Sequence, residues 1–284
     1  MKFLKCIQLS TLLILASVLV LSSCQKEEIH KDEIAMTTPG DEKVFLPITA
    51  DIKKKFKALN YDPEQVLKEI VQLPDGSSSE YYTILDLLYS EESLNLELEN
   101  QQNESIEKQW STGFFVAPGV IAVRGVNVGP SALSAQARAG LIRAVANYNA
   151  LGLTISFNLS FGPFNAAADI NAFTDSNPVP GGSSGFPILG NPFPLVRINS
   201  GTAGTTNLFE HIMTHEIGHA IGMRHTDRFC TASCGPVCVP QPAGAWIPGT
   251  PPTIQPGSIF NTCFTPGTNG EFNFWDQVAL TTIY

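Results

Sequence analysis

The stretch His215-Glu216-Ile217-Gly218-His219-Ala220-Ile221-Gly222-Met223-Arg224-His225 determines how the rest of this 284-residue chain is interpreted. Residues four apart share one face of a helix, so His215 and His219 would present two imidazoles side by side. Gly222 can end the helix in a left-handed turn at little cost, and the returning chain can bring back His225. Three nitrogens around a tetrahedral ion leave a fourth position for water, so the spacing predicts one catalytic Zn²⁺ ion.

The histidines of the chain are concentrated here. Four of the five lie between His211 and His225, which argues against chance. HExxHxxGxxH is a stronger signal than HExxH alone and is typical of zinc peptidases. A downstream glutamate is the rival third ligand, but the only one after His219 is Glu271, without a helical ExxxD context. We expect His211, one turn before His215, to pack near the site and not to bind the metal.

The first residues resemble an export signal. Lys2 and Lys5 precede an apolar run over residues 7–21 that is short for a membrane span and is followed at once by polar residues. Leu21-Ser22-Ser23-Cys24 resembles the lipobox of bacterial lipoproteins, which makes residues 1–23 a signal peptide and Cys24 the lipidated residue. Residues 25–28 are similar to a surface-export tag. We therefore expect an exported bacterial lipoprotein, anchored by its lipid at the outer membrane or cell surface, with plain secretion as the alternative.

The remaining cysteines fit an oxidising location. Cys230, Cys234, Cys238 and Cys263 are even in number, so we expect two disulfides that fix the loop after the metal site. Four cysteines allow three disulfide connectivities. We favour the one that pairs Cys234 with Cys263 and Cys230 with Cys238. A second zinc site is the alternative, but the spacing lacks the usual CxxC.

Charge divides the chain near residue 110. Of 26 acidic residues 19 lie between Glu27 and Glu107, and no lysine follows Lys108. This shift predicts a flexible tether over residues 24–42, a small N-terminal domain or propeptide-like region over 43–109, and a catalytic domain over 110–284. The net charge of −9 without a basic stripe argues against nucleic-acid binding.

Hydrophobic periodicity predicts an α+β fold with a mixed twisted sheet. We expect helices over residues 51–59, 63–73, 134–151 and 274–284, and strands over 80–88, 120–128, 154–161, 169–173 and 195–199. The active-site helix would begin with Asn207 as N-cap and Glu210 as its reciprocal partner. The region before residue 110 is too small for a substantial core of its own.

The order of these elements resembles the metzincin catalytic domain: strand, long helix, strands, HExxH helix, irregular disulfide-bearing loop and closing helix. More narrowly, residues 215–227 resemble the bacterial dual-action HEIGH metallopeptidases, with further similarity at Gln109-Trp110, residues 121–125 and residues 247–251. The resemblance covers about Trp110 to Tyr284. It implies His215, His219 and His225 as zinc ligands and Glu216 as catalytic base, with Gly222 and Asp227 supporting them.

One position departs from this family pattern. Metzincins carry a methionine turn beneath the metal, and the matching residues 258–261 have Phe260 instead. We expect this ring to fill the space under the imidazoles. The resulting hypothesis is a zinc endopeptidase acting on proteins or peptides, with a strand edge near Gly185 to Leu195 receiving the substrate. The alternative is a surface-displayed binding or adhesion module that keeps zinc for structure, which would have no use for Glu216. If the region before residue 110 is an inhibitory propeptide, Asp86 is a candidate for a carboxylate that covers the metal.

Replacing Cys24 tests the lipoprotein prediction. The Cys24→Ser chain should retain its leader and lose acylation, because the lipid is attached to that sulfur. Mass spectrometry of the membrane fraction measures both, with Cys6→Ser as a matched control that should mature normally. A Cys24→Ser chain that is cleaved and membrane-bound like the parent would show that the lipobox interpretation is wrong.

Overall fold

A curled, nine-stranded mixed sheet runs through the part of the chain that the computed structural model describes. That part comprises residues 45–101, 110–227, 241, 244–251, 253–264 and 267–284, all within the unit Gly40–Tyr284. The predicted leader, Cys24 and the tether lie outside it. Within the described residues, no helix is both long and apolar enough to cross a membrane.

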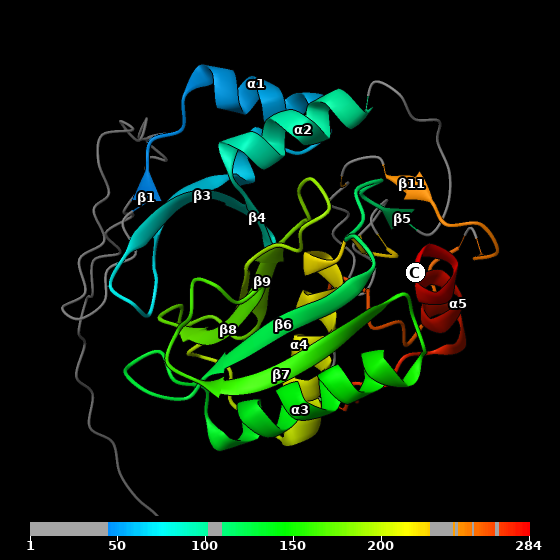
Figure 1. The fold of residues 1–284 in the computed structure, drawn as a ribbon. Coiled ribbons are helices and arrows are strands. Elements are labelled where there is room, and N and C mark those ends of the chain that lie inside the picture. Colours follow the sequence, from blue (N-terminus) through cyan, green and yellow to red (C-terminus); the bar gives the residue numbers. More distant parts are fainter. Residues whose placement is uncertain (1–44, 102–109, 228–240, 242–243, 252, 265–266) are drawn as a thin grey trace, which may run out of the picture. The chain divides into compact units, whose positions relative to one another are not determined.

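Four parallel strands and two helices form the main core. The strands, in their order across the sheet, are β10 (Leu195–Asn199), β8 (Ile170–Asp175), β6 (Gly119–Val126) and β7 (Ile155–Gly162). Helix α3 (Ala135–Ala150) connects β6 to β7 and packs beside α4 (Thr206–Ala220), as Figure 1 shows. These elements confirm the predicted strands and the predicted long helix to within a few residues.

Strand β9 (Gly182–Gly185) was not predicted, because its sequence Gly-Ser-Ser-Gly has low strand propensity. It pairs antiparallel with β10 and parallel with β4 (Leu87–Tyr89). A Cβ atom added at Gly182 would lie 2.8 Å from Glu216 Oε1 and 2.8 Å from Ile212. Glycine is therefore needed where β9 passes close to α4, and the strand is defined by its neighbours.

Two predictions for the N-terminal region were wrong. Residues 63–73 form a short 3₁₀ turn, Pro63–Gln65, and then β2 (Leu67–Gln72), because Glu69 and Val71 alternate inward against β3 (Ser78–Ile84). The single strand expected over residues 80–88 is two strands, β3 and β4, with Leu85 and Asp86 as the turn between them. β1 (Phe45–Leu46) completes this side of the sheet.

The N-terminal region also has a hydrophobic core, contrary to expectation. Helices α1 (Ala50–Ala58) and α2 (Glu91–Gln101) lie side by side over its strands (Figure 1). The buried members of this core are Ile52, Phe56, Leu59, Tyr61, Val66, Tyr82, Ile84, Leu87, Tyr89, Leu94 and Phe186. Phe186 comes from beyond residue 110, so the small core is completed by the following part of the chain.

The N-cap of the active-site helix lies two residues before the predicted one, Asn207. Thr205 is the N-cap of α4 and its side chain accepts a hydrogen bond from the Leu208 amide. Glu210 bonds Arg143 and Asn147 of α3 instead of capping the helix. The closing helix α5 (Phe274–Ile283) was predicted correctly and begins with a capping box between Asn273 and Asp276. A two-stranded sheet of β5 (Trp110–Ser111) and β11 (Ala245–Trp246) completes the described elements.

A buried ion-pair network joins the N-terminal strands to the parallel strands. The Arg197 guanidinium on β10 donates to Glu69 on β2 and to Asp175 on β8, at 2.7 Å in each case. All three side chains are nearly fully buried. Removing one partner of such a group leaves a buried charge with too few partners, which costs far more than removing an exposed ion pair.

Glu69→Ala should therefore lower the free energy of unfolding by about 3–5 kcal/mol, since Arg197 loses one of its two carboxylates. Glu80→Ala removes an exposed pair with Lys68 from the next strand and should cost about 1 kcal/mol or less. Urea denaturation of the parent and both variants measures the difference. Equal losses would show that the Arg197 network does not stabilise this junction.

Candidate metal centre

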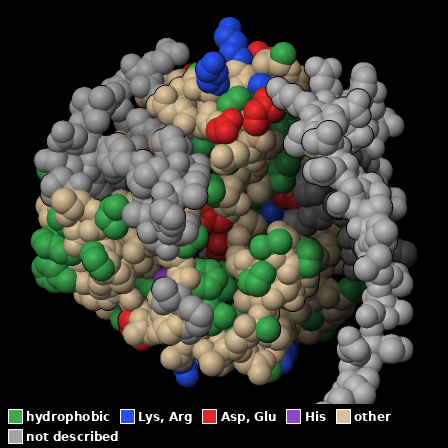
Figure 2. Space-filling model, turned by 180° about the vertical axis from the view of Figure 1, so that it is seen from behind, with side chains coloured by type: hydrophobic (Ala, Val, Ile, Leu, Met, Phe, Trp, Pro, Cys, Tyr) green, Lys and Arg blue, Asp and Glu red, His purple; other side chains and the backbone are tan. Residues whose placement is uncertain are grey.

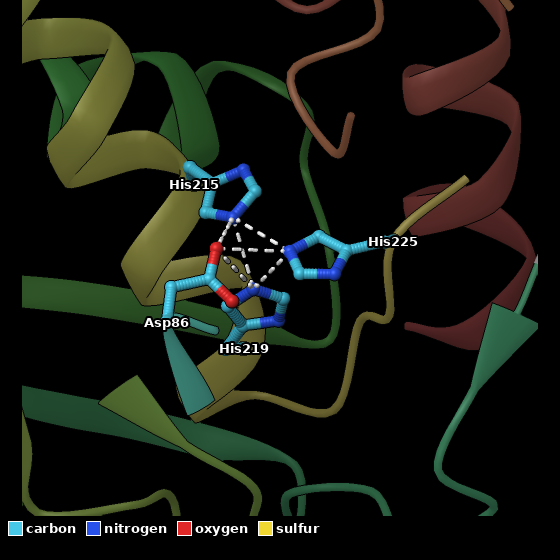
Figure 3. A group of neighbouring side chains, drawn as sticks. All are labelled: Asp86, His215, His219 and His225. Carbon is cyan, nitrogen blue, oxygen red and sulfur yellow. Dashed lines mark hydrogen bonds and ion pairs between the residues drawn. The ribbon is translucent and has the colours of Figure 1, made fainter. Parts of the chain in front are cut away.

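Helix α4 and the turn after it bring three histidines together. His215 and His219 lie one turn apart on the buried helix, and Ile221 ends it. Gly222 takes a φ of 106°, as predicted, and a Cβ atom there would lie 2.5 Å from the Phe114 carbonyl oxygen. The turn returns His225 to the helix face, as Figure 3 shows.

The three Nε2 atoms converge on one point. They lie 2.9 Å apart for His215 and His219, 3.1 Å for His219 and His225, and 3.2 Å for His215 and His225. Ligands about 2.0–2.1 Å from a tetrahedral zinc ion are separated by roughly 3.3 Å. The spacing thus fits three nitrogen ligands of a single ion.

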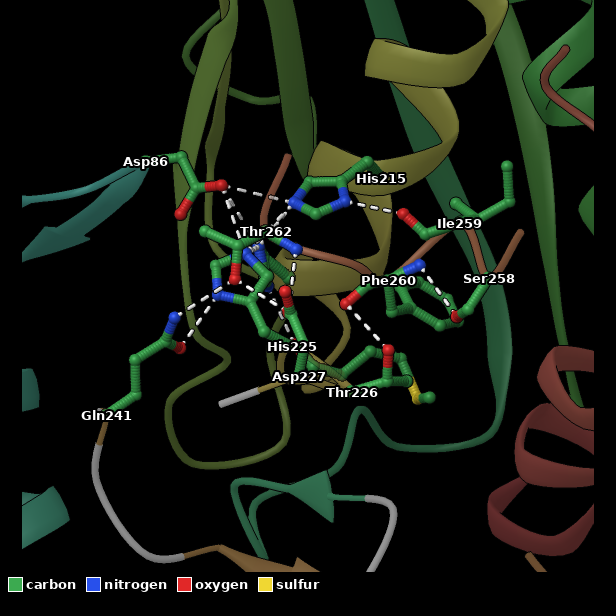
Figure 4. Close-up of polar contacts among 12 residues, drawn as sticks. Asp86, His215, His225, Thr226, Asp227, Gln241, Ser258, Ile259, Phe260 and Thr262 are labelled. Atoms are coloured by element: carbon green, nitrogen blue, oxygen red, sulfur yellow. Dashed lines mark hydrogen bonds and ion pairs between the residues drawn. The ribbon is translucent and has the colours of Figure 1, made fainter. Parts of the chain in front are cut away.

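Hydrogen bonds on the other side of each ring fix which nitrogen carries the proton. Nδ1 of His215 donates to the Ile259 carbonyl at 2.7 Å, and Nδ1 of His219 to the Met223 carbonyl at 2.7 Å. Nδ1 of His225 donates to Gln241 Oε1 at 2.7 Å (Figure 4). A proton on Nδ1 leaves a lone pair on each Nε2. Three lone pairs that face one another repel unless a cation lies between them.

A carboxylate completes the group. Asp86 Oδ2 lies 3.2 Å from His215 Nε2, 3.0 Å from His225 Nε2 and 4.0 Å from His219 Nε2 (Figure 3). Asp86 comes from the turn between β3 and β4, far from the histidines in sequence. One proton could join Asp86 to one imidazole, but only a cation satisfies all four acceptors. Within the described residues, this group of four is the one that could hold a metal ion.

The electrostatics agree with a site for positive charge. Burial lowers the pKa of His219 well below its usual range, with the charges of His215 and His225 adding to this effect. Burial alone would lower the pKa of His215, but Asp86 outweighs it and the pKa is raised. Burial would raise the pKa of Asp86, yet the surrounding imidazoles hold it well below its ordinary value. The raised pKa of His215 shows that the group favours one positive charge beside Asp86, and a bound metal cation would supply that charge in place of a proton.

Glu216 lies beside the histidines without joining them. Its side chain is buried between α4 and β9, and Oε2 has no hydrogen-bond partner among the described residues. Burial, with the nearby charge of Asp86, raises the pKa of Glu216 well above its usual range, although Arg197 opposes the shift. A buried carboxylate oxygen without a partner requires an explanation, and a proton-transfer role supplies one.

A pocket of about 450 Å³ opens beside Glu216 and His215. Val179, Ile212 and Phe264 give it apolar walls, and Asp86 also lines it. Figure 2 shows hydrophobic side chains around a hollow near the centre of one face, with acidic side chains inside it. Such a pocket next to a metal centre is the expected place for a substrate side chain.

His211 packs against His215 and is not among the residues whose ligand atoms converge, as expected. Its ring stacks 6.4 Å from that of His215, and its Nδ1 is 3.0 Å from the Asn269 carbonyl oxygen. Burial lowers its pKa to about 4, and the charge of His215 adds to that shift. His211 is therefore neutral and lines the pocket. Glu271 is exposed and outside the ligand group.

Residues 258–262 form the support beneath the imidazoles. The carboxylate of Asp276 accepts hydrogen bonds from Ser258 Oγ and the Ile259 amide, which places the Ile259 carbonyl under His215. Asp227 accepts from the amide and hydroxyl of Thr262 at 2.9 and 2.8 Å (Figure 4). Asp227 thus ties the segment after His225 to this support.

Phe260 lies fully buried against the active-site helix. A Cβ atom added at Gly218 would lie 2.2 Å from the Phe260 ring, so glycine at that position makes room for it. The ring packs 6.3 Å from that of Phe272. An aromatic side chain therefore fills the space where the family pattern has methionine.

Of the four cysteines, Cys230, Cys234 and Cys238 lie outside the described residues, so both disulfides stay predictions.

The family model of the dual-action HEIGH metallopeptidases (Peptidase M57) matches residues 85–284. No curated protein has a matching sequence. A solved structure of myroilysin has a TM-score of 0.39 and 14% identity, over 61% of this chain and 82% of that one. The crystal structure of metalloproteinase-II from Bacteroides fragilis has a TM-score of 0.34 and 9% identity, over 76% of each chain. The match that begins at Leu85 includes Asp86, Glu216 and the three histidines.

Phe260→Ala should lower the free energy of unfolding by about 3–5 kcal/mol, because it leaves a cavity under α4. Phe260→Met should cost less than about 1.5 kcal/mol, since a thioether fits irregular gaps of similar volume. Phe274→Ala is the matched control, as that ring is 66% exposed. Chemical denaturation of the three zinc-loaded variants measures the losses. A Phe260→Ala variant as stable as the Phe274→Ala variant would rule out the packing role.

Proposed function

The chain belongs to the dual-action HEIGH metallopeptidase family, and on this basis we propose that it is a zinc-dependent endopeptidase acting on proteins or peptides. One observation carries the proposal: three imidazole lone pairs converge beside a buried glutamate, Glu216, whose Oε2 has no hydrogen-bond partner among the described residues. Three nitrogen ligands with a separate carboxylate match the donor set of catalytic zinc sites. The glutamate has no purpose in a site that only stores metal.

Each side chain has a defined task in this proposal. His215, His219 and His225 would hold the ion through Nε2, while the hydrogen bonds of their Nδ1 atoms keep the rings in place. When bound, zinc polarises the scissile carbonyl and makes a water molecule more acidic. Glu216 would accept the proton of that water at Oε2 and deliver it to the leaving nitrogen. The apolar pocket would receive a hydrophobic side chain of the substrate.

A binding module with structural zinc is the second candidate, and Asp86 favours it. Structural zinc sites fill the fourth position with a protein ligand, and Asp86, 3.0 Å from His225 Nε2, would be the residue to do so here. The buried Glu216 beside an open pocket supports the enzyme instead. The two functions differ in whether the metal, once exposed, hydrolyses peptides.

We further propose that the enzyme acts at the bacterial outer membrane or cell surface, attached through acylated Cys24. Leu21 to Cys24 and the apolar run before them support this location. A lipid anchor would keep the metal centre outside the cell, where zinc and protein substrates are both accessible. The four later cysteines suit the same oxidising location.

Glu216→Gln separates the enzyme from the zinc-binding module. It should retain zinc, because the imidazoles are unchanged, and lose hydrolysis by roughly 100-fold or more, because proton transfer is lost. His219→Ala should lose the metal, and His30→Ala, outside the motif, should change neither property. Metal analysis and hydrolysis of a mixed peptide library give both values for the parent and for each variant.

Hydrolysis by Glu216→Gln at the parental rate would remove Glu216 from the mechanism. A zinc-loaded, correctly matured parent that hydrolyses no peptide would support the binding module.

A further inference from the structure

One of the three histidines is held by a side chain and not by the backbone. Nδ1 of His215 and Nδ1 of His219 each face a main-chain carbonyl oxygen, which can only accept a hydrogen bond. Nδ1 of His225 lies 2.7 Å from Oε1 of Gln241 instead (Figure 4). A side-chain amide has an acceptor on one side and a donor on the other, so its orientation determines which ring nitrogen of His225 carries the proton.

Thr262 determines the orientation of that amide. The Gln241 amide nitrogen, Nε2, donates to the hydroxyl oxygen of Thr262 at 3.2 Å, and this hydroxyl donates to Asp227 Oδ1 at 2.8 Å. A hydroxyl has one proton, so a threonine that donates to a carboxylate can only accept from an amide. The amide nitrogen must therefore face Thr262, which leaves the amide oxygen facing His225.

Asp227 fixes the proton of the Thr262 hydroxyl. Its Oδ1 also accepts a hydrogen bond from the Thr262 backbone amide at 2.9 Å, so one oxygen is the acceptor for both groups. Asp227 is fully buried and Gln241 is 6% exposed, so bulk water competes little for these bonds. Asp227, Thr262 and Gln241 thus form a hydrogen-bond relay that runs in one direction and ends at a protonated Nδ1 of His225.

The opposite orientation of the amide would disable the site. The amide nitrogen of Gln241 would then donate to Nδ1 of His225, and the ring proton would move to Nε2. That Nε2 atom lies 3.1 Å from Nε2 of His219 and 3.2 Å from Nε2 of His215, where the three lone pairs converge. A protonated nitrogen has no lone pair for a metal. The direction of the relay therefore determines whether His225 can be a ligand.

The relay joins the segments that build the site. Asp227 is two residues after His225, and Thr262 is two residues after Phe260 in the support beneath the imidazoles. Gln241 connects them from 16 residues beyond His225. A residue that only packs in this place would need a partner at neither end of its amide, whereas Gln241 has one at both ends.

We infer that Gln241 is a positioning residue for the proposed metal centre, with its amide oriented by Thr262 and Asp227 so that His225 keeps its Nε2 lone pair for the ion. This inference rests on the proposed function, because it takes the three histidines as ligands of a catalytic metal. It adds a requirement that the spacing of the histidines does not contain, since the third ligand depends on a side chain outside the motif.

Two substitutions of similar size at Gln241 separate hydrogen bonding from packing. Gln241→Glu keeps an acceptor for His225 and should bind zinc at least as tightly as the parent, since carboxylates are common partners of metal-bound imidazoles. Its other oxygen can accept from the Thr262 hydroxyl, which can turn away from Asp227. Gln241→Met fills the same space without an acceptor and should weaken zinc binding about 10- to 100-fold. Competition with a chelator measures these affinities on the complete chain.

Gln255→Met is the matched control for the loss of an amide. The Gln255 side chain donates to the exposed residue Thr253, so its replacement should leave the zinc affinity at the parental value.

Thr262 provides a second pair of variants that leaves Gln241 and His225 in place. Thr262→Val lacks the hydroxyl and frees the amide to turn, whereas Thr262→Ser keeps the relay. In zinc-free chains with 15N-labelled histidine, at a pH where the imidazoles are neutral, NMR distinguishes a protonated ring nitrogen from an unprotonated one. The parent and Thr262→Ser should show His225 protonated on Nδ1. Thr262→Val should show protonated Nε2, because a proton there relieves the repulsion among the lone pairs.

The results separate this inference from the function on which it rests. Equal zinc affinities for Gln241→Met and Gln241→Glu would overturn the inference, as would a Thr262→Val chain whose His225 stays protonated on Nδ1 alone. Either result would leave the peptidase standing if the parent cleaves peptides. Variants that bind zinc in the expected order, beside a zinc-loaded parent that hydrolyses nothing, would support the relay and contradict the peptidase.

Discussion

Three imidazole lone pairs that face one another at about 3 Å are the constraint on which the structure depends. Without a cation the arrangement is repulsive, so the fold must hold the rings there by other means. It does so through Nδ1, by presenting the carbonyls of Ile259 and Met223 and the amide oxygen of Gln241. Each acceptor comes from a different segment. The positions of those segments then follow from the need to place one oxygen behind each ring.

The surrounding packing serves the same need. Glycine at position 218 lets Phe260 approach α4, and the Phe260 segment is the one that supplies the Ile259 carbonyl. Glycine at position 182 lets β9 approach Glu216 on the opposite side. A side chain at either position would move a wall of the site by more than the tolerance of metal coordination. The glycines thus determine the distance between the helix and its neighbours.

The sequence was most informative where function and local geometry coincide. The spacing of His215, His219 and Gly222 predicts a helix, its end and a ligand face, and strong periodicity predicts β6 and α3. It was least informative where an element is defined by its neighbours. β9 has no strand propensity of its own, and Leu67 to Gln72 fits a helix or a strand until β3 pairs with it. Asp86 was only a candidate for masking, because no local pattern shows that a hairpin turn reaches His215, which lies 129 residues away.

The break in charge near residue 110 has a physical basis in the buried ion pairs. The region before residue 110 is rich in glutamate, and arginine is the only cationic residue type besides histidine in the part after it. Opposite charges of the two parts can therefore attract one another. Glu69 and Glu97 convert this attraction into two specific, desolvated pairs with Arg197 and Arg224. Arg197 also bonds Asp175 and Ser183, so Glu69 supplies the second of its two carboxylates. The charge of Arg197 is therefore shared between one carboxylate from each side of the break, which ties the N-terminal strands to the parallel strands.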